Sequence, residues 1–511
     1  MPKQRIKEID NTGVALQFVG LNTVYIPGGT GKLSKTDPIL YTSYSKFIEA
    51  VSEYEYADDK SFKMAKRLLQ LGLPVLYQGF PLNNLSYTAG MYTTRITVTL
   101  EPVEDSQTGE TWAKQVFTIN GINYIVGDTH LPAPANVPNT VCSYVVNPTT
   151  GAITYTNEGV ISNGIVDLGV IPGSQITTKQ VFTFDFGSSL VYYTVKKVAT
   201  GSNITITSDD WWELQDRNLY DVRFITTGGH PEATSSVMID VAAKRGDSVA
   251  LIDHTSDKNT VALVREAIEG IAMVNYTTIF QPVAESDNMC RSFGAAFTPW
   301  FTAKWDDVNE EFPASFGYLL AFARSAAAGN PIWVATAGSF RGMIPELVDV
   351  NVHYTNAECE MLGARAKDEE VDIDGIGDNV GIAINPIAYR RPYGYLIWGD
   401  RTLRENDGKL KATSQLHSRV LCSELNKALY QAANKYTFEQ NTDVLWINFK
   451  SEVNPLLEQM KSGEGIGDFK WTRLASNKRA RVNAKVAITP IDAVEDFDIT
   501  IYMENSIDIT E

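Results

Sequence analysis

Residues 249–254 read VALIDH, and a helical pattern of apolar residues follows at 259–271. A short apolar run followed by an amphipathic helix is typical of an α/β unit, in which the strand is buried in a sheet and the helix covers it. Outward from this unit, residues 44–54 and 61–71 predict two more helices, and PVLYQGF at 74–80 predicts another buried strand. The sequence therefore predicts a mixed α/β core.

Residues 87–214 differ in character from the flanking sequence. They are rich in Thr, Val, Tyr and Gly and alternate with period two, as in RITVTL at 95–100 and VFTFDF at 181–186. Two hairpins are predicted, one over 116–126 with its turn at Asn120-Gly121 and one around 147–151. Because α/β patterns stand on both sides of this stretch, we expect an all-β domain inserted into the α/β core.

Both ends of the chain carry short alternating patterns. The apolar residues are Val14, Leu16 and Phe18 near the start, and Phe497, Ile499, Ile501 and Met503 near the end. Such strands have too little apolar surface to form a domain, and a strand at a chain end frays unless another strand pairs with it. We expect them to be extended arms that link subunits. Folding of the last strand back onto its own chain is the alternative.

We expect an α+β or α/β multidomain fold with an inserted all-β domain and terminal arms. The longest helix is predicted at 415–436, where apolar residues recur at three- and four-residue spacing. The expected divisions are 1–20 for the N-terminal arm, 21–86 for the N-terminal part of the core, 87–214 for the insert, 215–380 for an α/β domain, 381–494 for a C-terminal domain and 495–511 for the C-terminal strand.

Composition narrows the possible functions. The 511 residues carry a formal net charge of −17, which argues against direct nucleic-acid binding because phosphate contacts require Lys and Arg. No run approaches the ~20 apolar residues of a membrane helix, and the start does not resemble a signal peptide. The four cysteines are far apart in sequence, so we expect reduced thiols, cytoplasmic synthesis and no membrane insertion.

No motif predicts catalysis, a cofactor or a metal. The run GGTGK at 28–32 lacks the first glycine and the final Ser or Thr of a phosphate loop, so we expect a surface turn. Asp253-His254 follows a strand, and we expect a capped strand end with a solvated histidine rather than half of a catalytic dyad. Asp372, Asp374 and Asp378 lack the glutamate of an EF-hand and favour an acidic turn.

Two further features concern interfaces. Trp211-Trp212 stands at the end of the predicted insert, where we expect it to bury a seam between domains. The acidic chain has one basic cluster, which is either a solvated hairpin or a docking face for an acidic partner. Its residues are Lys470, Arg473, Lys478, Arg479, Arg481 and Lys485.

The last 125 or so residues carry a series of motifs: NPI at 385–387, IWGDRTL at 397–403, the long helix, FEQNTDVLW at 438–446, a turn at 463–467 and PIDAVEDF at 490–497. In this order the motifs resemble those of the contractile tail sheath family of phages and related injection particles. The residues that carry the resemblance are Trp398, Gly399, Arg401, Thr402, Phe438, Glu439, Asn441 and Trp446. Two departures occur: HSR stands at 417–419 where the family has a tandem arginine, and FEQN replaces an FEPN-like run.

The resemblance implies a structural subunit, not an enzyme, with no cofactor. Such subunits form six-fold rings stacked helically around a tail tube, with an inner domain built from both chain ends, arms that exchange strands with neighbours, and inserted domains that point outward. Contraction from a metastable extended state drives the tube through a cell envelope for genome ejection. The implied partners are other copies of the chain, the tail tube protein, which the basic cluster would face, and baseplate and tail terminator proteins.

The implied location is a virion tail, assembled in the host bacterial cytoplasm. The alternative is a non-contractile virion shell or baseplate protein, which would share the composition and the strand exchange.

Overall fold

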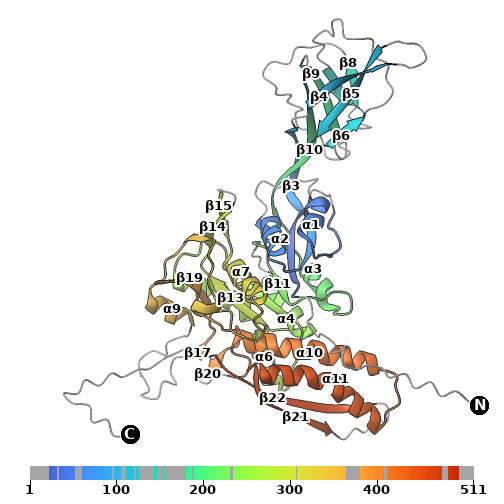
Figure 1. The fold of residues 1–511 in the computed structure, drawn as a ribbon. Coiled ribbons are helices and arrows are strands. Elements are labelled where there is room, and N and C mark those ends of the chain that lie inside the picture. Colours follow the sequence, from blue (N-terminus) through green and yellow to red (C-terminus); the bar gives the residue numbers. More distant parts are fainter. Residues whose placement is uncertain are drawn as a thin grey trace, which may run out of the picture. The chain divides into compact units, whose positions relative to one another are not determined.

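The computed structural model divides the chain into two compact units, whose elements are labelled in Figure 1. Unit 1 holds residues 1–26, 67–76 and 206–511, and unit 2 holds 27–66 and 77–205. The structure describes residues 22–30, 34–51, 60–94, 97–104, 111–119, 122–125, 143–146, 153–156, 180–186, 189–230, 234–305, 308–363, 380–407, 411–474 and 481–493.

A largely parallel sheet forms the centre of unit 1. The hydrogen-bonded order is β19-β18-β13-β12-β11-β1, parallel except where β19 returns antiparallel to β18. The strands are β1 (Val24–Thr30), β11 (Phe224–Thr226), β12 (Val249–Ile252), β13 (Gly294–Thr298), β18 (Asn385–Arg390) and β19 (Gly394–Ile397). All four residues of β12 are buried, as a strand covered on both faces requires.

Helices and small sheets surround these strands. The elements are α3 (Ser208–Trp212), α4 (Ser235–Arg245), α5 (Val261–Ala272), α6 (Ser286–Arg291), β14 (Phe301–Trp305), β15 (Val308–Phe312), α7 (Ala314–Ala327), α8 (Gly338–Arg341), β16 (Leu347–Val350), α9 (Asn356–Gly363), β17 (Val380–Gly381) and β20 (Asn406–Asp407). Helix α4 ends at Gly246, whose φ of 74° forms a left-handed cap that glycine adopts without strain.

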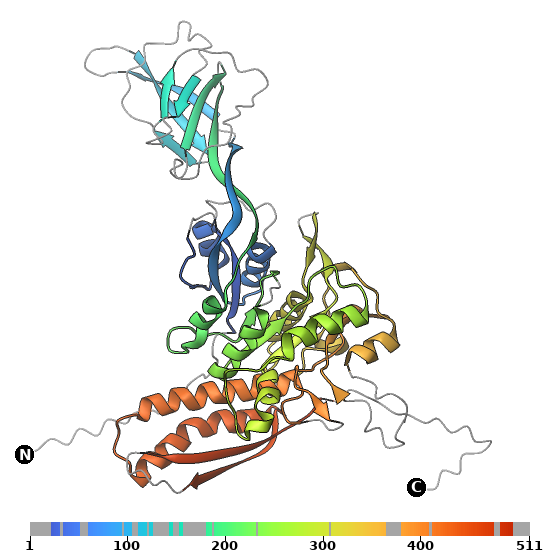
Figure 2. The same ribbon diagram turned by 180° about the vertical axis from the view of Figure 1, so that it is seen from behind.

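The C-terminal part of unit 1 is a helical pair with a β-hairpin. Helices α10 (Leu416–Tyr436) and α11 (Asp443–Ser462) lie side by side, and strands β21 (Ile466–Leu474) and β22 (Asn483–Pro490) run along them (Figures 1 and 2). None of the helices in the described ranges is long and apolar enough to cross a membrane.

Unit 2 contains further helices and antiparallel strands. They are β2 (Ile39–Tyr41), α1 (Tyr44–Val51), α2 (Lys60–Gln70), β3 (Val75–Thr94), β4 (Thr97–Glu104), β5 (Thr111–Ile119), β6 (Ile122–Ile125), β7 (Ser143–Val146), β8 (Ile153–Thr156), β9 (Gln180–Phe186) and β10 (Ser189–Ile204), although β3 and α2 both extend into unit 1. The ring of Phe47 packs against those of Tyr41, Phe62 and Tyr77 in its core.

The structure confirms several sequence predictions. The mixed α/β fold class is correct, and β12 and α5 occupy the predicted VALIDH strand and the helix after it. Both predicted hairpins pair, with Ile119 opposite Ile122 and Val146 opposite Ile153. That the β-rich stretch is a self-contained domain stays a prediction.

The two units do not follow the expected divisions. Residues 27–66 and 77–86, expected in the core, belong to unit 2, and the ranges 215–380 and 381–494 lie together in unit 1. Unit 2 ends at Thr205, so the end of the expected insert at 214 lies inside unit 1. Residues 206–214 belong to unit 1 because Trp211 is buried there. Its ring packs edge-on against Tyr25, and its indole N–H donates to Thr234 Oγ1 at 3.1 Å.

The surface turn expected at residues 28–32 is wrong for its first residues. Gly28 lies in the buried strand β1, and a Cβ added there would stand 2.1 Å from the Tyr77 hydroxyl oxygen. That hydroxyl donates to the Gly29 carbonyl at 3.1 Å. Glycine is therefore needed here for close packing; residues 31 and 32 lie outside the described ranges.

Candidate functional site

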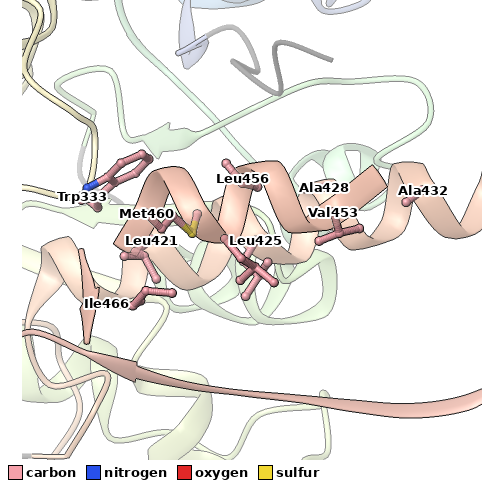
Figure 3. Close-up of a cluster of buried hydrophobic side chains, with 10 residues drawn as sticks. Trp333, Leu421, Leu425, Ala428, Ala432, Val453, Leu456, Met460 and Ile466 are labelled. Carbon is pink, nitrogen blue, oxygen red and sulfur yellow. The ribbon is translucent and has the colours of Figure 1, made fainter. Parts of the chain in front are cut away.

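The helical pair α10 and α11 has an apolar core of its own. Leu421 and Leu425 of α10 face Val453, Leu456 and Met460 of α11, and all five are buried (Figure 3). Helix α11 begins at a Thr442 cap whose hydroxyl accepts from the Leu445 N–H at 3.2 Å. Because the pair is held by its own core, it can present the adjoining hairpin on a rigid support.

The turn between α11 and β21 closes over Trp333. The indole N–H of Trp333 donates to the Gly463 carbonyl at 3.1 Å. A Cβ added at Gly465 would lie 2.5 Å from Trp333 Cδ1, so the indole lies where a side chain would be. The glycine turn predicted at 463–467 therefore fixes the angle at which β21 leaves the helices.

The β21–β22 hairpin has an inner and an outer face. Phe469, Trp471, Val486 and Ile488 pack against the helical core, while the residues between them are exposed. In the part of the chain that the structure describes, β21 and β22 pair only with each other. Within the described ranges, both long edges of the hairpin are therefore unpaired, and such edges can accept further strands.

The basic cluster divides between the two faces of this hairpin. Lys470 and Lys485 are exposed on the outer face. Arg473 points the other way and donates to Asp443 Oδ1 at 2.6 Å, at the start of α11. Arg481 is exposed just before β22, and Lys478 and Arg479 lie outside the described residues. The cluster therefore lies on a hairpin, as one of the two interpretations of the sequence expects, and Arg473 points away from the face that carries Lys470 and Lys485.

The first group of family-motif residues lies at the base of α10, where Asn385, Arg401 and Thr402 are buried. Asn385 donates to the carbonyls of Ala296 at 3.0 Å and Arg401 at 2.8 Å, and it accepts the Arg401 N–H at 2.7 Å. Gly399 lies against Asn385, where a Cβ would be 2.8 Å from Oδ1. Thr402 Oγ1 donates to the Thr413 carbonyl at 2.8 Å. These residues fix the loop that leads into α10.

The second group of motif residues lies at the other end of α10. Phe438 is fully exposed and has a φ of 74°, a conformation that costs a bulky residue strain. Glu439 and Asn441 are also exposed, whereas the Trp446 ring stacks on Phe449 and meets Trp471 edge-on. Because α10 is roughly 30 Å long, the two groups of motif residues do not form one site.

Trp398, which comes first in the chain among the residues that carry the resemblance, is half-exposed. The guanidinium carbon of Arg390 lies over its ring, 4.5 Å from the ring centroid.

A polar network that the sequence did not reveal holds residues 491–493. The side-chain amide of Gln415 donates to the Ala493 carbonyl at 3.1 Å and accepts the Ala493 N–H at 2.9 Å. His417 Nδ1 contacts the Asp400 carboxylate, and its Nε2 lies 3.1 Å from the Ile491 carbonyl oxygen. Asp400 and its hydrogen bond raise the pKa of His417 despite burial, which acts in the opposite direction. Only the departure HSR at 417–419 pointed to this position.

Asp253 and His254 do not form a dyad, and the expected solvated histidine is wrong. Asp253 is buried and accepts from Ser315 N at 3.0 Å and Ser315 Oγ at 2.5 Å, at the start of α7. Burial raises the pKa of Asp253 to about 6. His254 is buried as well, with Nε2 2.8 Å from Thr298 Oγ1, and burial lowers its pKa. Both groups join elements of the core.

The remaining predicted residues lie outside the described ranges. They are Val14, Leu16, Phe18, Phe497, Ile499, Ile501 and Met503 of the arms and the acidic residues Asp372, Asp374 and Asp378. Within the described ranges, no group of three or more His, Cys, Asp or Glu side chains could hold a metal ion.

Two sequence comparisons match parts of this chain. Residues 411–504 match the family model for the phage tail sheath C-terminal domain. The tail sheath protein of Vibrio phage KVP40 is 25% identical over 167 residues, which are 33% of this chain and 22% of that protein. The matched region thus spans about a fifth of that curated relative.

Solved structures also resemble this chain. The sheath tail protein from Desulfitobacterium hafniense has a TM-score of 0.47 and 12% identity, covering 96% of this chain and all of that one. The sheath complex of the extracellular contractile injection system PVC, in its contracted state, has a TM-score of 0.43 and 17% identity over 61% of this chain and 77% of that one. The sequence matches confirm the predicted resemblance to tail sheath proteins.

Proposed function

We propose that this chain is the structural subunit of a contractile tail sheath, and that it polymerises helically around a tail tube. The β21–β22 hairpin carries the proposal. It has two unpaired edges in the described part of the chain, it stands on a rigid helical pair, and it falls within the residues that match the sheath domain. An unpaired strand edge is satisfied by adding another strand, which is how a subunit can bind its own copies.

The terminal arms are the strands that would be added. Residues 494–511 follow directly from Ala493, which Gln415 holds beside the base of α10. The alternating residues Phe497, Ile499, Ile501 and Met503 suit a strand with one apolar face, and Val14, Leu16 and Phe18 give the N-terminal arm the same character. Strand addition between subunits would keep them linked while their bodies rotate and slide.

The outer face of the hairpin is the proposed contact with the tail tube. Lys470, Arg481 and Lys485 are exposed in a chain of net charge −17, so an acidic tube surface would be attracted to this side and repelled elsewhere. Arg473 is engaged with Asp443 and would contribute less. Baseplate and tail terminator proteins are the further partners, and the location is the tail of a virion or injection particle.

The mechanism that we propose needs no bound nucleotide and no catalysis. Subunits assemble into an extended, metastable packing, and rearrangement to a more stable packing releases the difference in free energy and drives the tube forward. The β-rich residues of unit 2 would form an accessory domain that does not take part in this packing.

Electron microscopy of the purified full chain tests the function. With its tube partner present, the chain should form striated tubes that change length and diameter after treatment with mild denaturant. Smooth tubes or closed shells of one fixed geometry would support the non-contractile alternative. Particles that stay monomeric at all concentrations, with and without tube protein, would reject polymerisation altogether.

A further inference from the structure

His417 has two neighbours that can only accept hydrogen bonds. Its Nδ1 faces the Asp400 carboxylate, and its Nε2 lies 3.1 Å from the Ile491 carbonyl oxygen. Neutral imidazole has one N–H donor, and the imidazolium cation has two. Both contacts can be satisfied together only when His417 carries its positive charge.

We propose that His417 is a pH-dependent latch on the C-terminal arm: its charged form ties residues 491–493 to α10, and its neutral form loosens this attachment. The consequence for the arm rests on the proposed function, whereas the latch itself does not. The latch is defined here as the contacts of His417 with Asp400 and Ile491.

The surroundings of His417 favour the charged form. Asp400 comes from the loop after β19 and Asp492 from the segment after β22, and both carry negative charge near the buried ring. The neighbouring cation on α10, Arg419, stacks on Phe293 at 4.1 Å. Burial opposes the charge, but the acidic partners outweigh it and raise the pKa of His417 above 6.5.

The neutral state also has a defined hydrogen-bond arrangement. Ser418 Oγ lies 3.2 Å from His417 Nε2 and can donate to it once the proton is lost. The Nε2 lone pair then faces the Ile491 carbonyl oxygen, which loses its donor and is repelled. The Gln415 pair and the 3.2 Å bond from Ile491 N to the Gly465 carbonyl then hold the segment without support from His417, so both bonds open more often. The change is therefore local and leaves the helical core unchanged.

The direction of the pH dependence follows from the raised pKa. When the pKa of a histidine is higher in the folded state than in the unfolded state, its protonation stabilises the folded state. This stabilisation is complete when the pH is below the pKa of the unfolded state, and it is lost as the pH rises through the pKa of the folded state. The latch is thus closed in weakly acidic solution and opens as the solution becomes alkaline. Residues 491–493 should respond while the core of α10 and α11 does not.

Hydrogen exchange of the full chain, corrected for the intrinsic effect of pH on exchange, tests the latch. Protection of the amides of Ile491 and Ala493 should fall at least about tenfold between about pH 6 and pH 9, since one charge-assisted hydrogen bond is lost. His417→Gln supplies a donor that does not titrate, so protection should no longer depend on pH. Asp400→Asn should move the change to lower pH.

His353→Gln is the matched control, because His353 is exposed and pairs with Asp349 away from this network. That variant should behave as the wild type does. Equal protection at both pH values in the wild type, or the same loss in His417→Gln, would overturn the latch. A chain that forms no tubes but keeps the pH-dependent protection would reject only the sheath function, and tubes with flat protection would reject only the latch.

Discussion

Arg223 and Glu424 form a buried ion pair that ties α10 to the start of β11. Arg223 Nη2 donates to Glu424 Oε2 at 2.5 Å, and both side chains are only 3% exposed. One turn further along α10, Lys427 pairs with Asp221 in the same stretch of chain. Helix α10, one of the two helices that support the candidate assembly hairpin, is therefore held to the central sheet by charge as well as by packing.

Glu424→Gln should destabilise unit 1, because it leaves the buried Arg223 cation without a counter-charge. Loss of one member of a buried pair costs about 3–5 kcal/mol of unfolding free energy. Urea unfolding followed by tryptophan fluorescence measures the change. Asp468→Asn, which breaks the exposed pair with Lys461, is the control and should leave the midpoint unaltered. Similar midpoints for the two variants would contradict this assignment.

Gly465→Ala should destabilise the turn before β21. The new methyl group would stand 2.5 Å from Trp333 Cδ1 and 2.8 Å from Leu421 Cδ1, so buried side chains must move. Overpacking of this kind costs about 1–3 kcal/mol. Gly270→Ala is the matched control: it lies within α5 with nothing within 4 Å of the added Cβ, and should stabilise by about 0.5–1 kcal/mol. If both substitutions shift the urea midpoint in the same direction, the close-packing argument fails.

The predictions from sequence succeeded where the signal was local. The apolar run at 249–252 and the helical period after it depend on residues a few positions apart, and both β-hairpins were marked by short alternating runs around turns. Such patterns reflect backbone geometry and the burial of one face, so no knowledge of distant contacts was required.

The predictions failed where a distant partner decides the environment. Gly28 was expected at the surface because nothing nearby in sequence shows that Tyr77 fills its side-chain space. His417 binds a carbonyl 74 residues further along the chain, and Asp253 binds Ser315, 62 residues away. Polar residues of this kind look solvated in a sequence, because only the fold brings their partners to them.

Asp253 should make stability depend on pH. Its pKa rises from 3.8 to about 6 on folding because the carboxyl is buried, so the folded state binds the proton more tightly than the unfolded state does. Protonation of Asp253 therefore stabilises the folded state. This stabilisation is complete when the pH is below the pKa of the unfolded state, and it is lost as the pH rises through about 6.

Asp253→Asn removes this titration and keeps an acceptor for Ser315. Relative to that variant, the wild type should lose up to about 3 kcal/mol of unfolding free energy between pH 4 and pH 7.5, as the size of the shift implies. Urea unfolding of both proteins at the two pH values gives the difference. A constant difference would show that the buried carboxyl titrates alike in both states.

Charge reversal on the outer face of the hairpin should weaken tube binding. In the double variant Lys470→Glu and Lys485→Glu, attraction to an acidic tube becomes repulsion, whereas folding is unaffected because both side chains are exposed. Co-sedimentation with tube protein should fall, and wild-type binding should weaken with added salt. Arg473→Glu, on the face that meets Asp443, is the comparison and should reduce binding less. Unchanged co-sedimentation of the double variant would remove this face from the tube contact.

Deletion of residues 495–511 should abolish polymers without unfolding the subunit. The buried core of α10, α11 and β21 contains none of these residues, and the last described contacts of the chain end at Ala493. The melting temperature should therefore stay within about 2 °C of the wild type, a shift that corresponds to less than about 1 kcal/mol in a large domain. Tubes should be absent in electron micrographs, because the strand that would fill a neighbour's open edge is missing.

A longer deletion, of residues 491–511, separates the two roles of this segment. It also removes the contacts with Gln415, His417 and Gly465, so its melting temperature should fall below that of the shorter deletion. If the shorter deletion already unfolds the subunit, the last strand folds back onto its own chain and stabilises the monomer. If it assembles into normal tubes, subunits are linked by some other part of the molecule. The combination of an intact monomer with no tubes is the result that assigns residues 495–511 to the link between subunits.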